Sequence, residues 1–110
     1  MPAQRLSSPN PMTESQFQSA VIELAKLNGY RLVYHTHDSR RSVAGFPDLV
    51  LVSEHRQRAL FRELKTSKGR LSPAQFDWIS SMQLAHLNAG VWRPEDLANG
   101  HILNDLRGKA

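Results

Sequence analysis

The feature that most constrains this chain is a pair of short apolar segments separated by a polar stretch. The first, DLVLV at 48–52, follows a proline, and the second, ALFRELKT, covers 59–66. Compact runs of Val, Leu and Phe bounded by polar residues are typical of strands. Because only residues 53–58 lie between the two segments, we expect them to pair as an antiparallel hairpin.

The hairpin predicts which side chains face each other. If the turn is centred between His55 and Arg56, paired residue numbers sum to 111 and Asp48 lies opposite Glu63. Their Cβ atoms are then roughly 5 Å apart. Two carboxylates at this distance repel each other unless a positive charge lies between them. Mg²⁺ supplies such a charge, since it binds one or two carboxylates together with water and substrate phosphate.

Lys65 completes this candidate site. It follows Glu63 by two residues, so both side chains point to the same face of the strand. An ammonium beside a metal-bound carboxylate can hold an attacking water or neutralise charge on a phosphate. The alternative is a solvated sheet face with an ordinary ion pair, which contributes little. The Pro-Asp step and the expected register favour the metal site.

A first helix is predicted from Thr13 to Asn28-Gly29. Thr13 and Gln16 have the spacing of a capping box, and Asn-Gly is a plausible stop signal. At roughly 100° per residue, Glu14 falls within about 20° of Val21. Glu14 therefore lies at the edge of the apolar stripe, where it can reach the sheet. Two interpretations remain open, because an acidic first turn is also favoured by the helix dipole.

A second helix is predicted from Pro73 to about Ala89, ending at Gly90. Ser72 has the position of an N-cap, with proline at the first helical position and Gln75 at the third. Gln75 shares a face with the apolar residues of this helix. It can therefore serve both the capping box and the site.

The remaining elements complete the expected fold. Segments 31–37 and 91–93 have strand character, and one more helical turn is expected after them. The order is α-β-β-β-α-β, which predicts an α/β sandwich around a mixed sheet. Residues 1–12 carry Pro and Ser without hydrophobic periodicity and are expected to form a flexible tail, so 13–110 is expected to be a single domain.

Two basic loops flank the expected site. One carries Arg40 and Arg41 before the Pro-Asp step, and the other carries Lys68 and Arg70 after Lys65. Such residues contact phosphates without regard to base sequence, although a charged loop is often only solvated. The net charge of +4 also favours a polyanionic partner.

Composition excludes several classes of protein. The sequence contains no cysteine, which excludes disulfides and thiolate metal sites. No apolar run approaches the roughly 20 residues of a membrane-spanning helix. No basic-then-apolar leader is visible at the N-terminus, so a cytoplasmic protein is expected.

Three segments together resemble a known family. They are GFPDLVLV at 45–52, FRELKT at 61–66 and GRLSPAQFDW at 69–78. With the glutamate of the first helix, they closely resemble the VRR-NUC branch of the PD-(D/E)XK nuclease superfamily. The resemblance implies a restriction-endonuclease-like fold and catalysis that depends on Mg²⁺ or Mn²⁺.

The resemblance also implies roles for individual residues. Asp48, Glu63 and the backbone carbonyl of Leu64 would bind metal, and Glu14 would complete the site or serve a second ion. Lys65 would assist the water and the transition state, and Gln75 would support the site. Stand-alone members of this size are similar to phage or bacterial proteins, often homodimeric, that cut branched or structured DNA, such as Holliday junctions or flaps.

The sequence therefore predicts a metal-dependent DNA endonuclease. Two alternatives stay open: a module that binds structured nucleic acid without cutting it, and a nuclease domain that requires a partner protein. The choice between DNA and RNA, and the preferred DNA structure, do not follow from the sequence.

Overall fold

The described part of the protein is built around one mixed β-sheet. The computed structural model describes residues 11–36 and 43–108. Their strands form a four-stranded sheet in the order β1-β2-β3-β4. The elements along the chain are α1 (Glu14–Leu27), β1 (Leu32–His35), β2 (Leu49–Ser53), β3 (Arg58–Leu64), α2 (Pro73–Leu84), β4 (Ala89–Trp92), α3 (Pro94–Ala98) and α4 (His101–Arg107).

The pairing of β2 and β3 confirms the predicted register. Leu49 pairs with Arg62 and Val50 pairs with Phe61, so the paired numbers sum to 111. β1 is also antiparallel to β2, whereas β4 is parallel to β3. The sheet is therefore mixed, as expected, and the predicted α-β-β-β-α-β order is confirmed.

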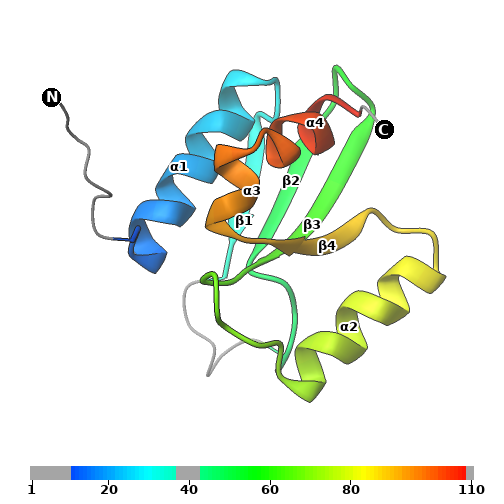
Figure 1. The fold of residues 1–110 in the computed structure, drawn as a ribbon. Helices are drawn as coiled ribbons and strands as arrows, with labels where there is room; N and C mark the ends of the chain where they lie inside the picture. Colours follow the sequence, from blue (N-terminus) through cyan, green and yellow to red (C-terminus); the bar gives the residue numbers. More distant parts are fainter. Residues whose placement is uncertain (1–10, 37–42, 109–110) are drawn as a thin grey trace, which may run out of the picture.

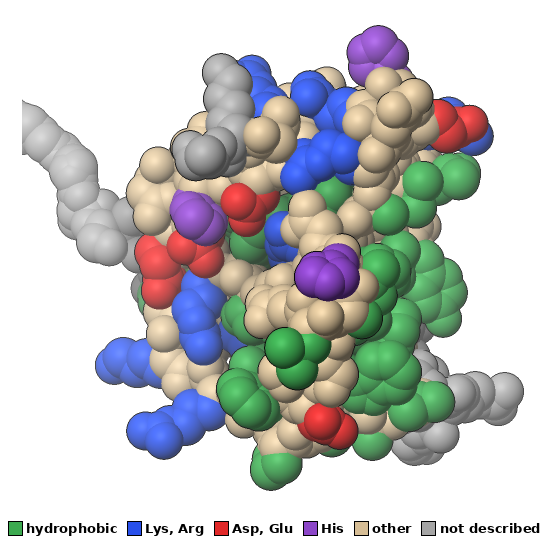
Figure 2. Space-filling view, turned by 90° about the vertical axis from the view of Figure 1, so that its right-hand side faces the viewer, with side chains coloured by type: hydrophobic (Ala, Val, Ile, Leu, Met, Phe, Trp, Pro, Cys, Tyr) green, Lys and Arg blue, Asp and Glu red, His purple; other side chains and the backbone are tan. Residues whose placement is uncertain are grey.

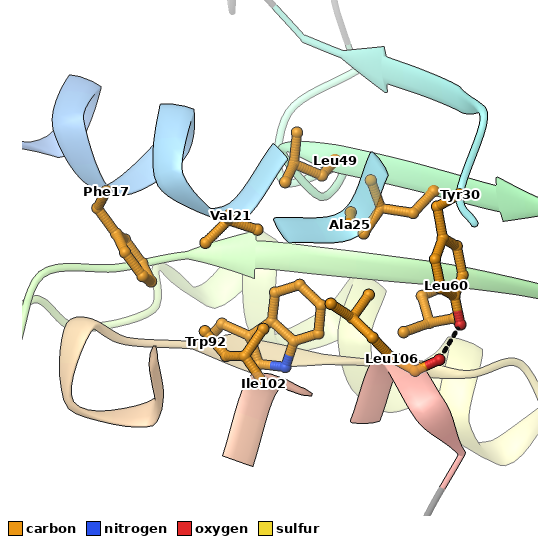
Figure 3. Close-up of a cluster of buried hydrophobic side chains, with 10 residues drawn as sticks. Phe17, Val21, Ala25, Tyr30, Leu49, Leu60, Trp92, Ile102 and Leu106 are labelled. Carbon is orange, nitrogen blue, oxygen red and sulfur yellow. Dashed lines mark hydrogen bonds between the residues drawn. The ribbon is translucent and has the colours of Figure 1, made fainter. Parts of the chain in front are cut away.

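The helices divide into two groups. Helices α1, α3 and α4 lie together on one face of the sheet, and α2 lies apart from them (Figure 1). The core lies between the sheet and the first group, where Val21, Leu60, Trp92 and Ile102 are almost wholly buried (Figure 3). The Tyr30 hydroxyl donates to the carbonyl oxygen of Leu106 at 2.6 Å, which fixes the end of α4 to this core.

Both predicted helix starts are confirmed. The Thr13 hydroxyl accepts from the N–H of Gln16, and the Gln16 side chain accepts from the N–H of Thr13. Ser72 and Gln75 form the same reciprocal pair at the start of α2. These caps satisfy backbone N–H groups that otherwise lack a partner.

The predicted end of α2 is wrong. The helix ends at Leu84 instead of continuing to Ala89. His86 adopts a left-handed φ of 67°, its N–H donates to Gln83, and the N–H of Leu87 donates to Met82. This is a Schellman motif with histidine where glycine is usual. Residues from Ala89 are thereby free to form β4 instead.

The C-terminal region is more helical than expected, because α3 and α4 replace the single turn predicted there. Of the predicted tail, residues 1–10 lie outside the described residues, as does the segment 37–42. Within the part of the chain that the structure describes, no helix is long and apolar enough to cross a membrane.

Candidate functional site

The two predicted carboxylates lie at the end of the β2–β3 hairpin. Asp48 directly precedes β2, and its Oδ2 accepts a hydrogen bond of 3.1 Å from the N–H of Leu64 at the end of β3. This bond continues the register of the hairpin beyond its last pair, Leu49 with Arg62. The expected juxtaposition of Asp48 and Glu63 is therefore present.

Glu63 is a buried carboxylate with an unsatisfied oxygen. Its exposed fraction is 3%, and its Oε1 atom has no hydrogen-bond partner. Burial and the neighbouring Asp48 carboxylate raise the pKa of Glu63 to about 8. A buried acceptor without a partner is costly, so this carboxylate is poised to accept a proton or a cation.

Two polar side chains contact the other oxygen of Glu63. The Gln75 Nε2 donates to Oε2 at 3.0 Å, and the Lys65 Nζ lies 3.9 Å from the same atom. The Oε1 of Gln75 meanwhile accepts from the N–H of Ser72. One amide therefore caps α2 and also holds Oε2 of Glu63.

The position of Gln75 depends on close packing between α2 and the segment before Asp48. Gly45 has a φ of +90°, and a Cβ atom there would lie 2.4 Å from the carbonyl carbon and oxygen of Ala74. Phe46 packs edge-on against Trp78 with ring centroids 5.3 Å apart. The Gly-Phe-Pro-Asp sequence therefore brings the start of α2 against the site. The sequence pattern by itself assigns this glycine no such role.

A cavity of about 130 Å³ opens beside these residues. Its lining includes Glu14, Asp48, Leu64 and Lys65. Glu14 is exposed on the first turn of α1 and faces the cavity from the side of the helix. The structure therefore brings the five predicted site residues to one region: Glu14, Asp48, Glu63, Lys65 and Gln75. Gln75 is connected to it by its hydrogen bond to Glu63.

The donor set fits a divalent cation held mainly by two carboxylates. Asp48 and Glu63 are adjacent, and Glu63 offers a free oxygen. Among the described residues, however, no three His, Asp or Glu side chains come together as a metal-binding group. Glu14 is thus not drawn into a tight cluster with the other two. Mg²⁺ commonly binds through one or two carboxylates and water, so this arrangement suits it.

The basic loops are only partly described. Arg40 and Arg41 lie outside the described residues. Lys68 and Arg70 lie in the stretch that follows Lys65, before α2, where both are exposed. Lys68 lines a second hollow next to the cavity.

Several residues near the site have no evident signal in the sequence. Met12, Phe17, Thr66 and Pro94 line the cavity, and Arg93 donates two hydrogen bonds to the loop after Lys65. The one sequence feature that points to Arg93 is its charge at the end of the short predicted strand 91–93. Its contacts depend on β4 lying parallel to β3, which no local pattern reveals.

Comparisons with known proteins identify the family and the fold. The family model described as the VRR-NUC domain matches residues 6–94. A solved structure titled "VRR_NUC domain protein" aligns with a TM-score of 0.63 and 20% identity, covering 88% of this chain and 92% of that chain. This likeness shows a shared fold. The comparison with curated proteins gave no match.

Proposed function

Because the chain belongs to the VRR-NUC family and carries a nuclease-type domain, we propose that it is a metal-dependent endonuclease that hydrolyses phosphodiester bonds in DNA. The observation that carries the proposal is the buried Glu63 carboxylate beside Asp48, with one oxygen free and Lys65 on the other side. In structural ion pairs the buried side-chain oxygens are in the large majority hydrogen-bonded, which favours a role for this oxygen in binding a cation.

The carboxylates would hold the cation. Asp48 and Glu63 would supply the charged oxygens and the carbonyl of Leu64 a third donor, while Glu14, which lines the same cavity as Asp48 and Leu64, would complete the site or serve a second ion. A bound Mg²⁺ or Mn²⁺ would lower the pKa of water and neutralise charge on the phosphate. Gln75 keeps Glu63 in one orientation through its hydrogen bond to Oε2.

Lys65 would act on the reacting groups. Its side chain is 19% exposed, and its ammonium lies 3.9 Å from Glu63. From there it can hold the attacking water by hydrogen bonding or stabilise the charge that develops on the phosphoryl oxygens. A partly buried ammonium acts more strongly than an exposed one, because less solvent screens its charge.

We propose branched or structured DNA as the substrate. The basic residues Lys68 and Arg70 next to the site support contacts with phosphates. Phosphate contacts position DNA but do not read its bases, so a domain that relies on them selects by shape. The choice of DNA over RNA, and of junctions or flaps over duplex, rests on the resemblance to the family.

We also propose that two copies associate. β1 is an edge strand, and it exposes Leu32 and Tyr34 by 47% and 59%. Phe76, Leu84 and Leu87, on and after α2, are exposed by 63%, 82% and 45%. Figure 2 shows hydrophobic side chains gathered in the lower and right-hand parts of that view. These are two separate exposed apolar groups, and an exposed apolar surface favours a protein partner. We propose the β1 edge, with Leu32 and Tyr34, as the surface that a second copy contacts.

The test is cleavage of a labelled panel of duplex, single-stranded, flap and four-way-junction DNA with Mg²⁺, Mn²⁺ or EDTA, beside Lys65→Ala. We expect products that require metal and disappear in the variant, while the circular dichroism spectrum stays unchanged. Equal cleavage by Lys65→Ala would contradict the assigned site. Binding without cleavage under every condition would favour the DNA-binding module or a missing partner protein.

A further inference from the structure

The turn that follows Lys65 is held by the segment after β4. The N–H of Gly69 donates to the carbonyl of Thr66 at 3.2 Å, which closes a tight turn over these residues. The guanidinium of Arg93 donates from Nη1 to the carbonyl oxygens of both Thr66 and Gly69, each at 2.6 Å. Arg93 therefore bridges the two ends of the turn.

Further bonds attach the turn and Arg93 to regular structure. The Ser67 hydroxyl donates to the Glu95 carboxylate at 2.8 Å. The N–H of Lys65 donates to the carbonyl of Trp92 in β4, and the N–H of Arg93 donates to the Asp96 carboxylate in α3. The turn is thus fixed to the sheet on one side and to α3 on the other, unlike an ordinary exposed loop.

The turn forms one wall of a groove of about 450 Å³. The groove is lined by Pro11, Met12, Thr66, Ser67, Lys68 and Pro94. Met12, Thr66 and Pro94 also line the cavity that contains Asp48 and Lys65, so the groove continues that cavity.

We propose that this groove receives the nucleotide next to the cleaved phosphodiester, with Lys68 contacting its phosphate and Arg93 as the positioning residue that fixes the turn. The inference rests on the proposed nuclease function. Met12 and Pro94 offer apolar contacts for a sugar or base, and Lys68 supplies a cation. No carboxylate is present among the described residues that line the groove, and the nearby Glu95 carboxylate accepts a hydrogen bond from the Ser67 hydroxyl.

The planar guanidinium suits Arg93 to this role. Both hydrogen bonds come from one nitrogen, Nη1, whose two N–H groups are fixed in the guanidinium plane, so it holds the two carbonyl oxygens in one geometry. Lysine keeps the charge on a flexible side chain without that planar group, so Arg93→Lys should restore the turn only in part. Arg93→Met keeps much of the apolar length and removes both hydrogen bonds.

The test measures binding of a fluorescent four-way DNA junction in Ca²⁺ and compares changes in the protein, changes in the DNA and the two combined. Phosphates near the branch point are replaced one at a time by neutral methylphosphonates, and each junction is titrated with wild type, Lys68→Ala, Arg93→Met and Arg93→Lys. At one position, next to the cleaved bond, the replacement should weaken wild-type binding several-fold. The same replacement should not weaken junction binding further in Lys68→Ala or Arg93→Met, because these variants have already lost the contact with that phosphate.

The salt dependence provides a second readout. The slope of log K against log salt should fall by about one in Lys68→Ala and Arg93→Met, with Arg93→Lys between them and the wild type. Lys26→Ala removes an exposed charge from the last turn of α1 and is the matched control. It should keep the wild-type dependence on the single methylphosphonate position.

The outcomes separate the two proposals. If Arg93→Met only lowers the thermal midpoint and still responds to the same methylphosphonate as wild type, its positioning role is overturned. If Lys68→Ala responds like wild type at every position, the groove is overturned. A wild type that binds the junction but never cuts DNA with Mg²⁺ or Mn²⁺ contradicts the nuclease function, while the binding measurements still decide whether Lys68 contacts phosphate. A wild type that does not bind the junction contradicts the groove and the proposed substrate together.

Discussion

The side-chain amide of Gln75 donates a hydrogen bond of 3.0 Å to Oε2 of Glu63, which ties the first turn of α2 to the buried carboxylate of β3. The same amide accepts from the N–H of Ser72 through its Oε1. One side chain therefore links helix initiation to the geometry of the site, and the two effects can be separated by mutation.

Gln75→Ala should reduce cleavage by about 10- to 100-fold, as is typical when a group that orients a metal ligand is removed. It should also cost about 1 kcal/mol of stability through loss of the cap. Initial rates at saturating DNA and chemical denaturation measure the two effects.

Ser72→Ala is the matched control for this variant. It removes the other half of the capping box but leaves the amide of Gln75 able to reach Glu63. Stability should fall by about 1 kcal/mol with little change in kcat. If Ser72→Ala loses as much kcat as Gln75→Ala, the contact with Glu63 has no separate role.

The raised pKa of Glu63 predicts a dependence of stability on pH. Its carboxyl binds a proton more tightly in the folded state, so the free energy of unfolding should fall as pH rises from 4.5 to about 8. A pKa shift from 4.5 to about 8 corresponds to a loss of up to about 5 kcal/mol in EDTA. Glu63→Gln should flatten this decline, which denaturant titrations across that pH range would reveal. An equal slope in both proteins would show that Glu63 is not the titrating group.

Divalent cations should reverse this loss. Above the pKa of Glu63, Mn²⁺ or Mg²⁺ should raise the thermal midpoint of the wild type, since a ligand that binds only the folded state stabilises it. Asp48→Asn and Glu63→Gln should respond much less, because each removes one of the two charged ligands. Scanning calorimetry with Mn²⁺ and with EDTA tests this, and an equal rise in all three proteins would indicate binding elsewhere.

Gly45→Ala should destabilise the protein by roughly 3 kcal/mol, because a Cβ there meets the α2 backbone and the positive φ adds strain. It should also lower cleavage by displacing Gln75. Gly100→Ala is the matched control, since Gly100 has a φ of +85° with nothing within 4 Å of a Cβ. The free energy of unfolding of that variant should fall by only about 1 kcal/mol. Similar losses in both variants would show that the contact with Ala74 is unimportant.

The proposed self-association is tested at Tyr34. Tyr34→Lys places a charge on the exposed apolar edge of the sheet and should shift the protein toward monomer in analytical ultracentrifugation. Tyr34→Phe keeps the surface apolar and should sediment like the wild type. A wild type that is monomeric at micromolar concentration would contradict the proposed dimer.

Local sequence determined the hairpin and the helix starts. The register of β2 with β3 follows from a short connection and the alternation of side chains, which suffice to place Asp48 opposite Glu63. The two capping boxes, at Thr13 and Ser72, involve residues three apart and are predictable for the same reason. These features depend on contacts between near neighbours in the chain.

The tertiary structure decided what local pattern could not. The sequence pattern predicts that α2 continues to about Ala89, yet the helix ends at Leu84 in a Schellman motif, and the residues from Ala89 pair in parallel with β3. The same long-range pairing delivers Arg93 to the turn beside Lys65. Glu63 is buried, which raises its pKa, and the amide that holds its Oε2 comes from α2, whose first turn packs against Gly45. The sequence thus specified which chemical groups the site contains, whereas their burial and orientation come from packing between segments far apart in the chain.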